Sequence, residues 1–376
     1  MKRRICLITE SLDRRRGGAE GYLADLVQSI IQAGHPVRAF LRRPGRSPSP
    51  VDTELVPTGT GWGPLREWRF ARAVQRRLAG TSDIVFSTLP SAIPQVTHYF
   101  SPGGLYCTGF EAERASFDPG LQQRFYRLGN RLNLQRQQRL AAQEWLLTRQ
   151  ARIKILTLSA AARNQILGLF HPPLENVATI PPGVDLTKFH AGPAATEHAE
   201  RLRLLFAGHN FRLKGLHCLL RALSRAGQSG LRADLTVAGG GAIGEFKALA
   251  GSLGLATQVH FRGPVSDGET SELFRSSDAL VHPTFADHCS LVVLEALASG
   301  LPIITTRQNG AAELMESGRQ GFVIEDPLDI EALATALLRL QDRESLNCMR
   351  AAALSLRPRL DFADHARRVL AWLTCD

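Results

Sequence analysis

Two carboxylates, Asp287 and Glu295, stand eight positions apart in a stretch of apolar and small residues. The pattern around them predicts a strand that ends at His282, a polar turn, and a helix over 291–299. Asp287 then lies in the turn and points into a cleft, where it can contact the hydroxyl groups of a ligand. Glu295 lies about two turns into the helix and can accept further hydrogen bonds from ligand hydroxyls.

The turn also exposes the start of the predicted helix. The amides of Cys289, Ser290 and Leu291 have no carbonyl partner one turn earlier. An unpaired helix amino terminus is a natural binding site for an anion such as a diphosphate. The alternative interpretation is a capped helix that carries two incidental acids.

Two cations, Arg212 and Lys214, follow a predicted strand over 202–207. Both can reach a phosphate, and fixed cations in a site closed to water stabilise a leaving diphosphate. Solvated surface cations are the alternative. No D-x-D or H-E-x-x-H sequence occurs, so metal-dependent chemistry is disfavoured and no cofactor is expected.

Short apolar strands alternate with amphipathic helices along the chain, which is the pattern of βαβ units and parallel sheets. The first half contains strand candidates at 4–9, 37–41, 83–87, 95–99 and 153–157, and helices over 19–33, 66–78 and 121–148. A stretch rich in Pro and Gly over 172–200, with one apolar strand inside it, is the expected linker. The pattern then restarts, with strands at 202–207, 234–238, 258–262, 279–282 and 302–305, and helices over 216–225, 245–253, 268–275 and 291–299.

The chain of 376 residues predicts two domains at about 150 residues each. We expect an N-terminal domain over 1–180, a C-terminal domain over 181–358, and a last helix within 359–376 that packs back on the N-terminal domain. Ligands bind outside the carboxyl ends of parallel strands. Two such sheets that face each other would therefore enclose the site.

The D-x7-E spacing, followed by ALASGLP at 296–302, resembles the E-x7-E signature of the retaining family 4 glycosyltransferases, with Asp287 in place of the first Glu. The general pattern of that family extends over nearly the whole chain. The resemblance implies an α/β protein of the GT-B fold, with two doubly wound Rossmann-like domains facing across a cleft. It also implies a hexosyltransferase whose donor is a nucleotide diphosphate sugar.

The resemblance assigns roles to several residues. Lys214 and Arg212 would hold the diphosphate. The family usually has Arg next to the Lys-Gly pair, whereas Leu213 intervenes here, so Lys214 is the stronger candidate. Gly17 and Gly18, in the turn after the first strand, would let the backbone approach the donor diphosphate and the acceptor.

Further roles are implied for segments that lie near the ends of predicted strands. Arg262 and Val265 belong to a segment that would contact the nucleobase through backbone atoms. His98 ends a strand candidate where many members carry a catalytic His or Asp, and a buried structural histidine is the alternative. Glu111 and Glu113 are further acceptor-side candidates. The AGGG segment at 238–241 is either a second glycine loop of the family or a close strand–helix turn.

Charge is distributed unevenly. Residues 1–160 carry 24 Lys and Arg against 12 Asp and Glu, and the remainder carries 21 against 23. The basic half implies an anionic partner or a solvated basic surface.

Within 105–152, arginines alternate with Phe125, Tyr126 and Trp145, which suits either an anionic membrane surface or a solvated helix. This stretch resembles the acceptor side of the bacterial lipopolysaccharide core glucosyltransferases. Its arginines are Arg114, Arg124, Arg127, Arg131, Arg136, Arg139, Arg149 and Arg152.

The resemblance therefore implies a retaining transferase that moves a hexose, glucose from UDP-glucose, to a lipopolysaccharide-core or other lipid-linked anionic saccharide. We expect it in the cytoplasm, peripheral on the inner membrane face, because no secretion signal or membrane-spanning run is apparent. The six scattered cysteines predict free thiols. The alternatives are another donor such as UDP-GlcNAc or GDP-mannose, an inactive paralogue, a sugar-nucleotide epimerase, and a basic nucleic-acid-binding protein. No nucleic acid partner is expected, because no recognition helix or stacking motif occurs.

Overall fold

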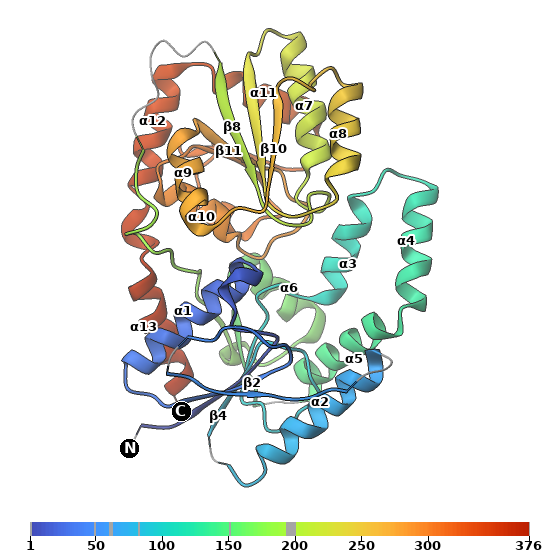
Figure 1. The fold of residues 1–376 in the computed structure, drawn as a ribbon, viewed down its shortest axis with the longest axis vertical. Coiled ribbons are helices and arrows are strands. Elements are labelled where there is room, and N and C mark those ends of the chain that lie inside the picture. The colour runs from blue at the N-terminus through green and yellow to red at the C-terminus, as the bar shows by residue number, and fades with distance from the viewer. Residues whose placement is uncertain are drawn as a thin grey trace. The chain divides into compact units, whose positions relative to one another are not determined.

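A computed structural model describes residues 2–48, 50–59, 63–81, 83–149, 152–192 and 201–375 of the chain (Figure 1). The chain divides into two compact units. The N-terminal unit contains residues 1–111, 119–181 and 363–376, and the C-terminal unit contains residues 112–118 and 182–362. The last helix therefore belongs to the N-terminal unit, and a short segment of the first half belongs to the C-terminal unit.

The N-terminal unit is built on a seven-stranded parallel sheet in the order β3-β2-β1-β4-β5-β6-β7. The order reverses between β1 and β4, which is the arrangement of a doubly wound fold. The strands are β1 Ile5–Thr9, β2 Val37–Leu41, β3 Asp52–Leu55, β4 Ile84–Ser87, β5 His98–Phe100, β6 Lys154–Thr157 and β7 Val177–Thr179.

Helices connect and cover these strands, as parallel pairing requires. They are α1 Gly18–Gln32, α2 Gly63–Arg77, α3 Tyr106–Ala115, α4 Leu121–Leu132, α5 Leu134–Arg149, α6 Ala160–Phe170 and the C-terminal α13 Phe362–Thr374. Trp372 of α13 packs edge-on against His98 of β5, with ring centroids 4.9 Å apart. His365 of α13 lies within hydrogen-bonding distance of Tyr22 of α1, at 2.6 Å.

The C-terminal unit has a six-stranded parallel sheet in the order β10-β9-β8-β11-β12-β13. Its order reverses between β8 and β11, so these two neighbouring strands mark the topological switch point. The strands are β8 Leu202–Ala207, β9 Ala233–Ala238, β10 Val259–Gly263, β11 Ala279–His282, β12 Ile303–Thr306 and β13 Gly321–Ile324.

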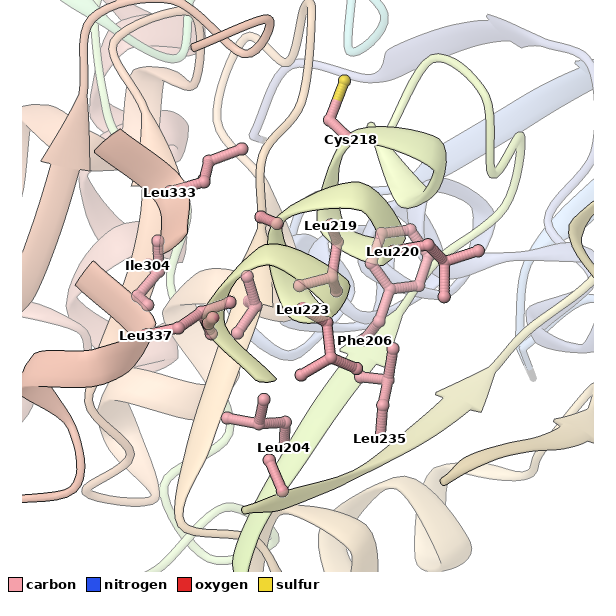
Figure 2. Packing of buried hydrophobic residues seen from close by; sticks show 14 of the residues in the cluster. Leu204, Phe206, Cys218, Leu219, Leu220, Leu223, Leu235, Ile304, Leu333 and Leu337 are labelled. Atoms are coloured by element: carbon pink, nitrogen blue, oxygen red, sulfur yellow. The ribbon is translucent and has the colours of Figure 1, made fainter. Parts of the chain in front are cut away.

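Helices flank both sides of this sheet, with α7 and α8 on one side and α9, α10 and α12 on the other (Figure 1), and α11 packs against α7. They are α7 Leu216–Gln228, α8 Ile243–Ser252, α9 Asp267–Ser276, α10 Leu291–Ala298, α11 Ile330–Arg339 and α12 Arg343–Leu354. Figure 2 shows how the apolar face of α7, with Leu219 and Leu223, packs between Leu204 of β8 and Leu337 of α11. This apolar core holds in place the strand ends that carry the candidate site.

The structure differs from the sequence expectations in several places. The predicted helix over 121–148 is two helices, because Asn133 leaves the helical conformation and its side chain accepts a hydrogen bond from the amide of Arg136. The strand predicted at 95–99 begins only at His98, after a turn at 94–95. The apolar strand in the expected linker is β7, which pairs with β6 of the N-terminal sheet, and residues 193–200 lie outside the described part. Strands β3 and β13 and helices α3, α6, α11 and α12 were not predicted.

Candidate active site

The candidate site lies at the switch point of the C-terminal sheet. The loop after β8 carries Arg212 and Lys214, and the loop after β11 carries Asp287. Because β8 and β11 are parallel neighbours, their carboxyl ends meet at the same edge of the sheet. The fold therefore brings together two segments that are more than 70 residues apart in sequence.

Close backbone contacts hold these two loops together. The Leu213 carbonyl accepts hydrogen bonds from the Phe285 amide, at 2.9 Å, and from the Thr284 hydroxyl, at 3.2 Å. Gly215 has a φ of +80°, and a Cβ at this position would lie 2.0 Å from the carbonyl oxygen of Pro283. Only glycine fits there, which explains why a glycine follows Lys214.

Lys214 and Asp287 form an ion pair across the two loops. The ammonium Nζ donates to Asp287 Oδ2 at 2.5 Å, and the two side chains are only 19% and 17% exposed. Burial by itself would raise the pKa of Asp287, but the charge of Lys214 and the neighbouring His282 outweigh it and hold this pKa well below its usual range. At neutral pH the Asp287 carboxyl is therefore ionised.

His282, the last residue of β11, completes this cluster and was not among the predicted site residues. The ring is fully buried, stacks on Phe206, and has Nε2 3.8 Å from Asp287 Oδ2. Burial lowers the pKa of His282, against the opposing effect of the Asp287 charge. The sequence signal that could have found this residue was a histidine at the end of a buried strand, five positions before Asp287.

The start of α10 is only partly open. The Ser290 amide donates to Asn309 Oδ1 at 3.2 Å, so the expectation that the amides of Cys289, Ser290 and Leu291 are all unpaired is wrong for Ser290. Asn309 belongs to the loop after β12 and acts as the cap that sequence reasoning did not identify. Leu291 is the first residue of the helix, where no earlier helical carbonyl is available. Cys289 is buried, which raises the pKa of its thiol well above the ordinary value.

Glu295 lies on the outward face of α10. Leu291, Val292 and Glu295 are half-buried, whereas Val293, Leu294 and residues 296–298 are fully buried. Residues four apart share one helix face, so Glu295 lies one turn beyond Leu291 on the same side. The D-x7-E spacing thus places one acid before the helix and one on its solvent-facing side.

Arg212 and Lys214 do not point at a common partner in this structure. Arg212 Nη2 donates to Glu245 Oε2 of α8 at 2.9 Å, and its guanidinium lies 4.9 Å from the ring centroid of Phe117. Nη1 reaches the Ser116 carbonyl at 3.5 Å. The side chain is 24% exposed.

The AGGG segment follows β9 and serves close packing. Gly239 has a φ of +122°, and a Cβ there would lie 1.8 Å from the carbonyl oxygen of Gly208. The Gly239 amide donates to the Gly263 carbonyl at 2.8 Å. These contacts favour the strand–helix turn over a glycine loop dedicated to a ligand.

The segment after β10 holds the residues predicted near the nucleobase. Arg262 is exposed at the end of β10, and Val265 is half-buried in the loop that leads into α9. Ser266 caps α9 with a capping box formed with Glu269. The capping box fixes the backbone where this loop enters α9.

The glycine pair of the N-terminal unit occupies the corresponding switch point, after β1. Gly17 is the N-cap of α1, and Gly18 is its first residue. The preceding turn is held by Asp13, which accepts hydrogen bonds from Arg15 Nε at 2.9 Å and Nη2 at 2.7 Å. The start of α1 thus presents backbone amides at the edge of the sheet where ligands bind in such folds.

His98 is the first residue of β5, so it does not end that strand as predicted. It is level with Phe86 of β4, which is level with Leu7 in the middle of β1. Its Nδ1 lies 2.9 Å from the Thr97 hydroxyl, its ring packs on Trp372, and burial lowers its pKa to about 4. This environment favours the alternative of a structural histidine. Glu111 and Glu113 lie on α3.

Comparison with known proteins identifies both halves of the chain. The family described as "Glycosyltransferase Family 4" matches residues 16–188, and "Glycosyl transferases group 1" matches residues 193–354. Together the two matches extend from the glycine pair after β1 to the end of α12. The chain belongs to this glycosyltransferase family. The predicted family membership is confirmed.

The curated relatives are similar over part of their length. A D-inositol 3-phosphate glycosyltransferase 1 from Catenulispora acidiphila is 30% identical over 240 residues, which cover 58% of this chain and 56% of that protein. A D-inositol 3-phosphate glycosyltransferase from Streptomyces avermitilis is 34% identical over 198 residues, or 47% of this chain and 42% of that protein. The chain thus matches about half the length of these relatives.

Solved structures are similar over the whole chain. The crystal structure of WaaG, a glycosyltransferase involved in lipopolysaccharide biosynthesis, has a TM-score of 0.81 at 21% identity and covers 99% of this chain and 100% of that one. HepE from Anabaena in complex with UDP-glucose has a TM-score of 0.74 at 17% identity and covers 99% of both chains. The predicted GT-B architecture of two doubly wound parallel sheets is confirmed.

Proposed function

We propose that the chain is a retaining glycosyltransferase that transfers a hexose, glucose from UDP-glucose, to an anionic saccharide carried on a lipid. The observation that supports the transfer reaction most directly is the Lys214–Asp287 ion pair at the switch point, beside the start of α10. A largely shielded cation next to a helix amino terminus is suited to a diphosphate leaving group.

In this proposal each residue of the site has a separate task. Lys214 leaves Asp287 to hold the diphosphate, with the Leu291 amide beside it, and Arg212 exchanges Glu245 for the same ligand. Asp287 then accepts hydrogen bonds from hydroxyls of the transferred sugar, and Glu295 from the ribose. The acceptor oxygen bonds to the sugar C1 on the face from which the diphosphate departs. Its proton passes to the departing diphosphate oxygen.

A thermal-shift panel of UDP-, GDP- and ADP-sugars tests the donor. A ligand that binds only the folded chain stabilises it, by about 2.7 kcal/mol at a concentration one hundred times its dissociation constant. We expect the largest shift with UDP-glucose. The structures of HepE with UDP-glucose support this choice of base and sugar. A larger shift with GDP-mannose would reassign the donor, and no shift with any nucleotide sugar would refute the transferase.

The surface of α4 supports a lipid-linked acceptor. Leu121, Phe125, Leu128 and Leu132 are 68%, 68%, 54% and 70% exposed. At 100° per residue they share an arc of about 60° on the helix. Arg124, Arg127 and Arg131 lie beside this arc and are also exposed. An apolar stripe flanked by arginines is the arrangement of a helix that lies in an anionic membrane interface.

The opposite face of α4 is attached to the protein. The Arg136 guanidinium of α5 donates from Nη1 to the Tyr126 hydroxyl at 2.9 Å and lies 4.8 Å from the ring centroid of Phe110 of α3. The apolar stripe therefore points away from the N-terminal unit. Of the three aromatic residues predicted for a membrane surface, only Phe125 is exposed, because Tyr126 is half-buried and Trp145 packs on the core. In the described part of the chain no helix is both long and apolar enough to cross a bilayer.

Flotation with lipid vesicles tests this docking. We expect the chain to bind vesicles that contain phosphatidylglycerol, and the double variant Phe125→Ser/Leu128→Ser to lose that binding. Gln122→Ser, on the same helix beside the stripe, is the matched control and should bind normally. Loss of a dimer in light scattering, with unchanged flotation, would instead assign the stripe to a second copy of the chain.

A soluble phosphorylated acceptor is the second candidate. The curated relatives named D-inositol 3-phosphate glycosyltransferase favour it. Both candidates share a phosphorylated acceptor, which suits the basic N-terminal half. Transfer assays with radiolabelled donor separate them, because only one class of acceptor should become labelled. Isomerisation of the donor without any acceptor would point to an epimerase.

A further inference from the structure

His282 combines complete burial with unsatisfied polar atoms. Neither ring nitrogen has a hydrogen-bond partner among the described residues, and Nε2 is 3.8 Å from Asp287 Oδ2, beyond hydrogen-bonding distance. Buried polar atoms are paired in the great majority of cases. An exception beside the proposed donor site calls for a functional reason.

The surroundings of the His282 ring contain groups that favour its protonated form. Asp287 faces it from the loop after β11, and the backbone of Ala207, at the end of β8, also favours the charged ring. Lys214, from the loop after β8, opposes it. Two further neighbours are neutral: Phe206 stacks on the ring, and Gly208 lies beside Cε1.

Without a ligand, Lys214 neutralises Asp287 and burial keeps the His282 ring neutral. A nucleotide sugar brings a dianionic diphosphate and, in the proposed function, takes Lys214 away from Asp287. The carboxylate would then lie next to two further negative charges with no cation of its own. Like charges that lie close together in a shielded site repel strongly. One neighbouring group that can supply a positive charge is the imidazole.

We propose that His282 takes up a proton from solvent when the nucleotide sugar binds, and that the imidazolium replaces Lys214 as the partner of Asp287. It is a positioning residue: the ring holds the carboxylate in place for the sugar hydroxyls and does not touch the reacting atoms. This inference rests on the proposed function, because it requires a diphosphate at Lys214.

The sign of the pH dependence follows from linkage. The free ring binds its proton weakly and the donor-bound ring binds it tightly, so between the two pKa values donor binding is accompanied by proton uptake. In that range the dissociation constant rises by up to about tenfold for each unit of increasing pH. A diphosphate diester does not titrate near neutrality, so the ligand contributes no slope of its own.

Calorimetric titration of the full chain with UDP-glucose measures the uptake directly. In buffers of different ionisation enthalpy at one pH, the observed heat should change in proportion to the protons taken up, towards one per nucleotide sugar. His282→Phe keeps the stacking on Phe206 but has no proton to gain. It should bind more weakly at pH 6 and show neither the buffer dependence nor the pH slope. A wild-type titration answers the question even if this variant is unstable.

His288 provides the matched control, because it is half-buried next to Asp287 and its pKa also responds to that carboxylate. His288→Gln should keep the proton uptake. A slope that disappears in His288→Gln and persists in His282→Phe would overturn the assignment. Binding of UDP-glucose by the wild type without proton uptake would overturn the inference alone. Failure of every nucleotide sugar to bind would overturn the proposed function together with it.

Discussion

Replacing Lys214 by alanine is the sharpest test of the site. The side chain is only 19% exposed and its Nζ is 2.5 Å from the Asp287 carboxylate, so the charge is fixed and partly shielded. In the proposed reaction this ammonium contacts the diphosphate as negative charge develops on it. Removing it should slow transfer while the fold remains.

The size of the effect follows from the shielding. At about 4 Å and an effective dielectric constant of about 20, two unit charges attract by about 4 kcal/mol. A barrier higher by that amount corresponds to a rate loss of about a thousandfold. Arg212 can supply part of the missing charge, so we expect kcat/KM to fall by about 10²–10³, the range found when one preorganised donor is removed from an active site.

Stability must be measured alongside activity, because the variant also leaves Asp287 without its cation. A partly buried carboxylate that loses its partner costs about 1–3 kcal/mol. The double variant Lys214→Ala/Asp287→Asn should recover most of that free energy of unfolding in urea, yet remain inactive. This comparison separates a loss of folded protein from a loss of chemistry.

The assay is transfer of radiolabelled hexose to an acceptor identified in the labelling screen, at saturating and limiting donor. Lys188→Ala is the matched control, since Lys188 is an exposed cation of the same unit that pairs with Asp185 at 3.7 Å. It should retain wild-type kcat/KM. If folded Lys214→Ala is as active as Lys188→Ala, the diphosphate does not bind at this cation and the reasoning fails.

Three further predictions concern stability. Because the pKa of Asp287 is lowered, its ion pair contributes fully to the free energy of unfolding above about pH 4 and is lost only at lower pH. The difference in unfolding free energy between wild type and Asp287→Asn should therefore be the same at pH 7 and pH 5. His98 stays neutral down to about pH 4 in the folded chain, whereas in the unfolded chain it becomes protonated near pH 6.5. The free energy of unfolding of the wild type should therefore fall by about 2 kcal/mol between pH 6.5 and pH 5. Urea unfolding of His98→Gln should not show this decrease. Gly239→Ala should lower the melting temperature markedly, because its Cβ would lie 1.8 Å from the Gly208 carbonyl oxygen, whereas Gly244→Ala, with no atom within 4 Å of its Cβ, should not.

The sequence predicted the parts of the fold that local patterns encode. Buried parallel strands such as 202–207 and 279–282 are mostly apolar, and their ends agree with the structure. Polar edge strands and short helices carry no such signal. The strand Asp52–Leu55 is largely exposed, so its pairing with β2 depends on tertiary contacts and was missed.

The candidate site was predicted as a set of residue types but not as an arrangement. The local motifs and the family resemblance predicted Asp287, Glu295 and Lys214, because the D-x7-E and Lys-Gly patterns are local in sequence. They did not reveal that Lys214 pairs with Asp287 in the absence of a ligand, that Arg212 pairs with Glu245, or that Asn309 caps the Ser290 amide. Each of these contacts joins different loops.

The sequence by itself determined two βαβ series and the change from a basic to a near-neutral half, and it predicted the residues that would bind a diphosphate. These follow from hydrophobic periodicity and from residue chemistry, which act over a few neighbouring positions. Only the tertiary structure decided which of those side chains meet, that His98 begins β5 and packs on Trp372, and that His282 is buried near Asp287. Those outcomes depend on the strand order, which places β8 beside β11, and on the packing of side chains from distant segments.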